Sequence, residues 1–223
     1  MTTRVKICGL TSPADVEAAV RAGADAVGFV FAESPRRVSP QAARELARAV
    51  PPFVVRVGVF VDETYDAAAR IAEDAGLHVI QLHGRADEAV ILRLQRLGYQ
   101  VAQAVRMRDE RDVNAVAGTA ADAVLLDTFS PGRAGGTGRT FDWRLARAAM
   151  AALDARGKRL PVVLAGGLTP ENVADAVRTV RPFAVDVSSG VEAAPGRKCP
   201  EKMQRFVRKV READGFAADD HRR

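Results

Sequence analysis

Two glycine-containing turns near the C-terminal end of the sequence are the first candidates for a binding site. Gly166-Gly167 follows the apolar run V-V-L-A, and the S-S-G run at 188–190 follows F-A-V-D-V. Glycines leave backbone N–H groups open to a ligand, and N–H groups at a helix start bind phosphate. The T-P-E run at 169–171 predicts such a helix, with Thr169 as its N-cap. The residues expected to hold a phosphate group are Gly166, Gly167, Ser189 and Gly190.

Lys6 and Cys8 are the next candidates, because they occupy alternate positions in a strand predicted at 5–8. Successive side chains of a strand point to opposite faces, so Lys6 and Cys8 face inward if the apolar residues beside them face outward. Asp186 alternates with valines in the same way in the strand predicted at 183–187. A buried ion pair between Lys6 and Asp186 would make both residues structural, and direct catalysis is the alternative.

Cys8 and Asp127 together indicate proton transfer. A buried cysteine is commonly a small apolar residue, but a nearby lysine would lower the pKa of the Cys8 thiol and produce a thiolate base. Asp127 follows the apolar run V-L-L and opens a glycine-rich loop that continues to Phe141, so it is either a loop cap or an acid. A thiolate and a protonated carboxyl beside a phosphate site favour proton transfer on a phosphorylated sugar, without metal or nucleotide.

Eight apolar runs alternate with helical patterns and must position these residues. Such alternation is typical of an α/β fold, the single-domain (β/α)8 barrel. A doubly wound open sheet fits less well, because C-G-L-T at 8–11 lacks the further glycines of a dinucleotide-binding turn. The strands are predicted at residues 5–8, 25–31, 54–61, 78–82, 99–105, 123–126, 162–165 and 183–187.

The last helix is predicted from Pro200 to about Ala213, which gives a barrel domain over residues 1–213. Residues 214–223 have no apolar periodicity, so we expect a disordered tail there. Catalytic residues of barrels lie at the C-terminal ends of the strands. The other polar residues at predicted strand ends are Arg36, Gln81, His83 and Arg106.

The composition limits the other classes of protein to which the chain could belong. The 223 residues are 48% hydrophobic and 5% aromatic, which suits parallel strands covered by alanine-rich helices. The formal charge of +5 comes from scattered arginines without interleaved aromatics, so we expect no nucleic-acid partner. The two cysteines make neither a disulfide framework nor a metal motif, and a cytoplasmic location is expected. No apolar run approaches a membrane span, so no membrane partner is expected.

Several motifs resemble the phosphoribosylanthranilate isomerase family of tryptophan biosynthesis. They follow the order of that family over about residues 4 to 210, and the combination of K-I-C-G, Q-L-H-G and D-V-S-S-G-V-E is highly specific. The motifs are K-I-C-G at 6–9, G-F-V-F and S-P-R at 28–36, G-V-F-V at 58–61, Q-L-H-G at 81–84, L-L-D at 125–127, G-G-T-G at 135–138, L-A-G-G-L-T-P-E-N-V at 164–173 and D-V-S-S-G-V-E at 186–192.

The resemblance implies a (β/α)8 barrel that catalyses an Amadori rearrangement of N-(5-phosphoribosyl)anthranilate and needs no cofactor. It implies that Cys8 is the general base, Asp127 the general acid and Arg36 the ligand of the anthranilate carboxylate. Gly167, Ser189 and Gly190 would donate to the phosphate. We expect Lys6, Gln81, His83 and Asp186 to support the site, with a phosphosugar as substrate and a monomer or homodimer as the assembly.

One position departs from the family pattern. The family usually has aspartate before its last helix, whereas this chain has Cys199, which weakens an N-cap by about 0.5–2 kcal/mol and is partly offset by Pro200. Two rivals share the fold. A histidine-pathway aminoaldose isomerase is described with two aspartates, which Cys8 contradicts, and an inactive phosphosugar-binding barrel would not need Cys8, Asp127 and Arg36 together.

Overall fold

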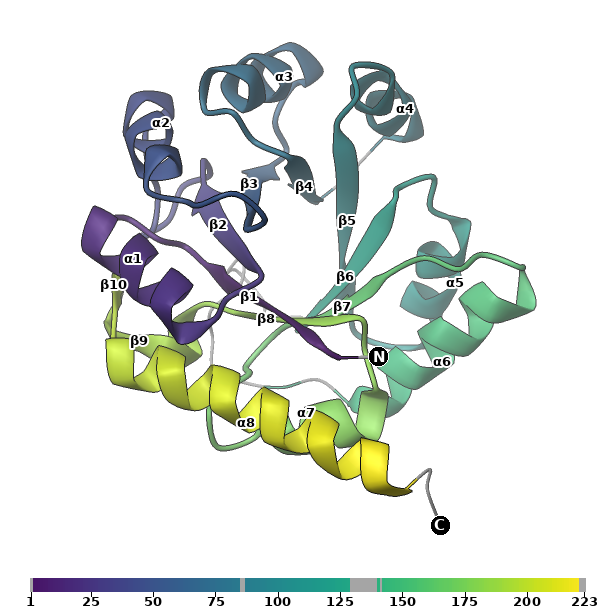
Figure 1. Ribbon diagram of the computed structural model, residues 1–223. Coiled ribbons are helices and arrows are strands. Elements are labelled where there is room, and N and C mark those ends of the chain that lie inside the picture. Colours follow the sequence, from purple (N-terminus) through teal and green to yellow (C-terminus); the bar gives the residue numbers. More distant parts are fainter. Residues whose placement is uncertain (1, 85–86, 129–139, 141, 221–223) are drawn as a thin grey trace.

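The computed structural model describes residues 2–84, 87–128, 140 and 142–220, and in this part of the chain eight parallel strands form a closed barrel (Figure 1). The predicted fold class is therefore confirmed. Each strand pairs with the next in the sequence, and the last pairs with the first. The strands are β1 (Arg4–Cys8), β2 (Ala26–Val30), β3 (Val55–Val61), β4 (Val79–His83), β5 (Gln100–Met107), β6 (Ala123–Thr128), β7 (Val162–Leu164) and β8 (Ala184–Val187).

The helices surround the barrel, and the last helix, α8, packs between α1 and α7 (Figure 1). None of the helices in the described part of the chain is long and apolar enough to cross a membrane. They are α1 (Pro13–Ala22), α2 (Pro40–Arg48), α3 (Tyr65–Asp74), α4 (Glu88–Arg96), α5 (Glu110–Gly118), α6 (Trp143–Ala155), α7 (Val173–Val180) and α8 (Pro200–Asp220).

The barrel closes where β1 lies beside β8, and this seam sets the direction of the candidate side chains. Lys6 is the register partner of Asp186, and the Lys6 Nζ donates to Asp186 Oδ1 at 2.9 Å. Val5 and Ile7 face outward and are fully buried under the helices. The predicted inward direction of Lys6 and Asp186 is therefore confirmed.

The hydrophobic core has two parts. The larger part lies between the outer face of the strands and the helices, where Phe29, Ile80 and Leu126 are almost fully buried. A much smaller cluster inside the barrel consists of Ala104, Leu125 and Ala165, with Val163 beside it. Leu125 and Ala165 of this cluster also line a pocket at the carboxyl ends of the strands, where the site was predicted.

Helix α7 begins later than predicted. Its first residue is Val173 and its N-cap is Asn172, so the predicted start of the helix at Pro170 is wrong. The Thr169 hydroxyl instead accepts from Glu171 N at 3.2 Å, and Asn172 Oδ1 accepts from Thr169 N at 2.8 Å. The carbonyl oxygen of Thr169 also accepts from Val173 N at 3.0 Å, so Thr169 caps a separate turn that precedes the helix.

The segment after β8 was only partly predicted. A 3-10 turn (Ser189–Val191) follows β8, and a short antiparallel hairpin of β9 (Glu192–Ala194) and β10 (Arg197–Lys198) follows that turn. Helix α8 then continues to Asp220, beyond the predicted end near Ala213. The predicted tail therefore begins too early in the sequence. Most of the predicted glycine-rich loop falls at 129–139 and 141, outside the described residues.

Candidate active site

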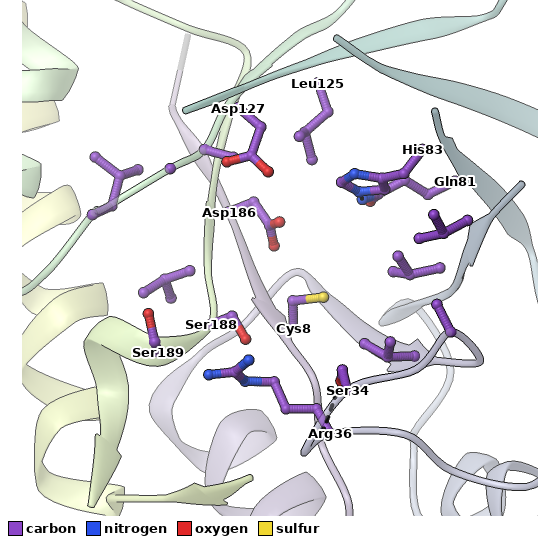
Figure 2. A pocket seen from close by; sticks show the side chains of 18 of the residues that line it. Cys8, Ser34, Arg36, Gln81, His83, Leu125, Asp127, Asp186, Ser188 and Ser189 are labelled. Carbon is purple, nitrogen blue, oxygen red and sulfur yellow. Dashed lines mark hydrogen bonds between the residues drawn. The ribbon is translucent and has the colours of Figure 1, made fainter. Parts of the chain in front are cut away.

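A pocket opens at the carboxyl ends of the barrel strands, and it gathers the predicted site residues (Figure 2). Lys6 lies deeper on β1 than Cys8, and neither Lys6 nor Arg106 is part of the lining. The predicted residues that line the pocket are Cys8, Arg36, Gln81, His83, Asp127, Gly166, Gly167, Asp186, Ser189 and Gly190.

Cys8 ends β1 with its thiol in the pocket, packed against Gly28 of β2. A Cβ at Gly28 would stand 2.8 Å from the Cys8 sulfur, so the glycine provides the space for the thiol. Burial raises the pKa of Cys8, and the positive charge of Lys6 only partly opposes this. The predicted lowering of the thiol pKa is therefore wrong, because the sequence showed the lysine but not the extent of burial.

Lys6 keeps its charge despite burial. Burial by itself lowers the pKa of Lys6, but the charges of Asp186 and Cys8 outweigh it and leave that pKa above its ordinary value. The side chains of Lys6 and Asp186 are 8% and 10% exposed. The expected buried ion pair is present, and its carboxylate also lines the pocket.

Asp127 directly follows the apolar residues of β6. Figure 2 shows its carboxylate in the pocket, together with the carboxylate of Asp186 and the thiol of Cys8. Burial raises the pKa of Asp127 to about 6, and a hydrogen bond from Thr128 N at 2.8 Å partly opposes the increase. The Asp127 carboxyl therefore keeps its proton up to a higher pH than an ordinary aspartate does. The two candidate proton carriers, Cys8 and Asp127, are both shifted toward their neutral forms.

Gln81 and His83 form an uncharged wall on β4. The Gln81 side-chain nitrogen donates to His83 Nε2 at 2.6 Å, which leaves the imidazole proton on Nδ1. Burial lowers the pKa of His83 to about 4, and the charges of Lys6 and Arg106 act in the same direction. His83 is therefore neutral at pH 7 and serves as a hydrogen-bonding group rather than as a cation.

Arg36 already has a partner, which sequence reasoning missed. Its Nε and Nη2 donate to the two oxygens of Glu192 at 2.7 and 2.8 Å, and Lys198 Nζ donates to Glu192 Oε1 at 2.9 Å. The Lys198 side chain is fully buried. The sequence did offer a sign of this network, because Glu192 ends the D-V-S-S-G-V-E motif and Lys198 lies in the P-G-R-K run before the last helix.

The two glycine-containing turns meet, as predicted for a phosphate site. A Cβ at Gly190 would lie 1.9 Å from the carbonyl oxygen of Leu168, so only glycine allows the turn after β8 to approach the turn after β7 this closely. Asn172 Nδ2 donates to Gly167 O at 2.9 Å and braces the first turn. Asn172 is a second residue that the sequence interpretation missed.

Among the described side chains, no group of three or more histidine, cysteine, aspartate or glutamate residues is placed to hold a metal ion. The arrangement is that of a pocket with two candidate proton carriers, Cys8 and Asp127. Arg36 and residues of both glycine turns also line the pocket.

Comparisons with known proteins agree with this geometry. The family model of N-(5'phosphoribosyl)anthranilate (PRA) isomerase matches residues 5–209. The N-(5'-phosphoribosyl)anthranilate isomerase of Trichlorobacter lovleyi is 46% identical over 211 residues, which cover 94% of this chain and 98% of the relative. That of a Geobacter species is 49% identical over 206 residues, covering 92% of this chain and 96% of the relative.

Solved structures give the same result. Phosphoribosyl anthranilate isomerase from Thermotoga maritima matches with a TM-score of 0.85 and 41% identity, covering 95% of this chain and 100% of that one. A phosphoribosyl anthranilate isomerase in complex with reduced 1-(o-carboxyphenylamino)-1-deoxyribulose 5-phosphate matches with a TM-score of 0.81 and 40% identity, with the same coverage. From its sequence, fold and pocket, this chain belongs to the phosphoribosylanthranilate isomerase family.

Proposed function

We propose that Cys8 and Asp127 are the general base and the general acid with which this chain performs the reaction of its family. That reaction is the Amadori rearrangement of N-(5-phosphoribosyl)anthranilate to 1-(2-carboxyphenylamino)-1-deoxyribulose 5-phosphate in tryptophan biosynthesis. The observation that carries the proposal is one pocket lined by both proton carriers, Arg36 and two glycine turns in contact. A biosynthetic role of this kind also supports the expected cytoplasmic location.

The two residues act in sequence. Asp127 protonates the ring oxygen of the furanose, and the ring opens to a Schiff base. Cys8 then removes the proton from C2 and produces an enolamine, which tautomerises to the ketone. General acid–base catalysis of this kind contributes about 10²–10⁴ in rate for each positioned group.

The protonation states of the pair are compatible with this chemistry, although the pKa shifts of the two groups favour a different placement of the proton. Between the pKa of Asp127, about 6, and the raised pKa of Cys8, the pair holds one proton, which lies on the sulfur. The reaction needs that proton on the carboxyl and a thiolate on Cys8. Both arrangements carry the same number of protons, so they are populated in the same pH range. Lys6 stabilises the thiolate form.

Binding is assigned to other residues. Arg36 Nη1 makes no hydrogen bond to the described residues, and together with the second N–H of Nη2 it matches a carboxylate in a fork, so we assign the anthranilate carboxylate to this edge. Backbone N–H groups of the two glycine turns take the phosphate, with Gly166, Gly167, Ser189 and Gly190 as the contributing residues.

The test is direct. The purified chain is mixed with phosphoribosylanthranilate, and the fluorescence of the anthranilate group is followed as the substrate is consumed. We expect a rapid loss of fluorescence that depends on enzyme concentration. No acceleration over the buffer rate by a folded sample would contradict the proposal, and a Glu45→Gln variant, changed in an exposed ion pair of α2, serves as the matched control.

A homodimer is the assembly that we propose. The Thermotoga maritima enzyme is described as dimeric. In this chain Phe53 lies between α2 and β3 with its side chain fully exposed, and we assign this side chain to the contact with the second copy. Sedimentation should give a dimer for the wild type and a monomer for Phe53→Ser. A wild-type monomer at micromolar concentration would contradict this assembly.

A further inference from the structure

A buried network of three charged side chains supports the mouth of the pocket. Glu192 lies between Arg36 and Lys198, with Arg36 on both of its oxygens and Lys198 on Oε1. Only 14% of the Arg36 side chain, 5% of Glu192 and none of Lys198 is exposed. Three charges so close together and so deeply buried are expensive to maintain, so the network needs an explanation.

We propose that Glu192 and Lys198 are positioning residues that fix the carboxylate subsite and its distance from the phosphate subsite. Glu192 holds the Nε–Nη2 edge of Arg36, and the Nη1–Nη2 edge then stays available to a carboxylate in the pocket. Lys198 fixes Glu192 and the turn after β8 at the same time. This inference rests on the proposed role of Arg36.

The first argument is geometric. An arginine side chain has several rotatable bonds, and a loop residue such as Arg36 would lose much rotamer freedom on binding a ligand. The bidentate bond to Glu192 removes that freedom before the ligand arrives, because the two parallel N–H···O bonds fix the plane of the guanidinium. A ligand carboxylate then binds a preorganised fork.

The second argument is electrostatic. Burial lowers the pKa of Lys198, but the hydrogen bond and the charge of Glu192 oppose that shift. With one carboxylate against two cations the network carries a net charge of +1, and burial strengthens its effect on any ligand in the pocket. Burial raises the pKa of Glu192, but the hydrogen bonds from Arg36 and Lys198 outweigh it and keep that pKa below its ordinary value. Glu192 therefore stays ionised, and the remaining positive charge fits an anionic ligand group.

The third argument concerns the connection between subsites. Lys198 Nζ also donates to the backbone carbonyl of Ser188 at 3.1 Å, directly before the turn that holds Ser189 and Gly190. The hairpin that carries Lys198 is fixed in turn, because Thr11 Oγ1 donates to Gly196 O at 2.8 Å. One buried amine thus links the support of Arg36 to the phosphate turn.

The test uses two ligands that differ by one group. One is reduced 1-(o-carboxyphenylamino)-1-deoxyribulose 5-phosphate, and the other is the phenylamino compound that lacks the carboxylate. Dissociation constants of both are measured by calorimetry, and the preference for the carboxylate is their ratio. The variants are Arg36→Ala, Glu192→Asp, Glu192→Gln and Lys198→Met, with Glu45→Gln as the control outside the site.

We expect Arg36→Ala and both Glu192 variants to bind the carboxylated ligand about tenfold more weakly, with little change for the other ligand. Glu192→Asp keeps the negative charge, but its shorter side chain cannot make the same bidentate bond to Arg36. It therefore distinguishes the effect of the carboxylate's position from the effect of its charge. It also keeps the test valid if Glu192→Gln does not fold. Lys198→Met should weaken both ligands, because it releases the phosphate turn as well. The Arg36→Ala, Glu192→Asp double variant should lose no more preference than Arg36→Ala alone.

The outcomes separate this inference from the proposed function. If Arg36→Ala loses the preference but Glu192→Asp keeps it at the wild-type ratio, Glu192 has no positioning role and the inference is wrong. If Arg36→Ala itself keeps the preference, the assignment of Arg36 to the carboxylate fails and the inference fails with it. If the wild type has no isomerase activity, the proposed function is contradicted, whatever the binding data show.

Discussion

Ionisable groups inside the barrel and those that join its outer elements differ in how far hydrogen bonds and ion pairs compensate their burial. Inside, burial shifts the pKa values of Cys8, Asp127 and His83 toward the uncharged forms. Outside, Asp25 accepts from Val5 N at 2.7 Å and from Arg211 Nη2 at 2.9 Å, which ties α8 to the start of β1. The interior groups lose hydration without full compensation, whereas Asp25 is satisfied by a backbone N–H and a cation.

This difference shows which groups lower the free energy of unfolding and are expected to serve the reaction instead. An ionisable group that is shifted toward its neutral form costs stability whenever the pH forces it to ionise, and such groups gather at active sites. A compensated surface network contributes to stability and does nothing for the reaction. Substitutions inside should therefore change activity, whereas those outside should change the free energy of unfolding.

Cys8→Ser should give the largest effect. A serine hydroxyl is nearly isosteric with the thiol but stays protonated, so we expect kcat to fall by about 10²–10⁴, or about 3–5 kcal/mol of barrier. Binding of the reduced product analogue should change little, because its phosphate and carboxylate contacts lie elsewhere. A kcat within a few-fold of wild type would exclude the thiolate base and make Asp186 the next candidate.

Asp127→Asn should lower kcat by a similar factor and also stabilise the fold. Asparagine keeps the shape of Asp127 but cannot deliver its proton. Raising the pKa of Asp127 from 3.8 to about 6 costs the folded state about 3 kcal/mol once the group is ionised. The wild type loses this stability as the pH rises from about 4 to about 6, and the loss stays constant above that range.

Urea denaturation at several pH values measures this effect. The variant should be more stable than wild type by up to about 3 kcal/mol at pH 8, and the difference should shrink to nothing near pH 4. A gain that stays the same over this range would show that the ionisation of Asp127 is not its cause. The acid limb of the kcat/KM profile, expected near pH 6 in the wild type, should also disappear in the variant.

Asp25→Asn should lower stability and leave activity unchanged, which is the opposite of the effect expected for Asp127→Asn. It weakens the hydrogen bonds to Val5 and Arg211, and we expect a loss of about 1–3 kcal/mol in the free energy of unfolding. The kcat should stay within twofold of wild type, because Asp25 lies at the start of β2, away from the pocket. Equal losses of activity in Asp25→Asn and Asp127→Asn would remove the contrast between interior and exterior groups.

The sequence predicted those features that depend on local pattern. Alternating apolar runs indicated the eight strands, and the two-residue period of a strand was enough to turn Lys6 and Asp186 into the barrel. The close approach of the glycine turns was also readable, because each turn follows its own strand.

Features that depend on distant residues were missed. Glu192 lies 156 residues from Arg36 in the sequence, and no periodicity reports such a contact. The short hairpin that carries Glu192 and Lys198 has no apolar alternation by which to recognise it. The direction of the Cys8 pKa was wrong for the same reason, because it depends on how completely other elements bury the thiol.

Cys199→Ser is the smallest expected effect, and it applies the same chemical change outside the barrel. Cys199 directly precedes Pro200, the first residue of α8, and its thiol lies 3.1 Å from Glu201 Oε2. A serine at this position can accept from the first free N–H groups of the helix, as the aspartate usual in the family would, so we expect a gain of about 0.5–1 kcal/mol in stability.

The kcat of Cys199→Ser should be unchanged, because Cys199 is not part of the pocket lining. Alkylation gives a second comparison of the two thiols. Reaction at Cys199 should leave activity intact, whereas reaction at Cys8 should abolish it, and the bound product analogue should slow only the reaction at Cys8. If Cys199→Ser lowered kcat as much as Cys8→Ser, the activity loss would reflect the loss of any thiol rather than of a base in the pocket. The contrast therefore depends on the position of the sulfur as well as on its chemistry.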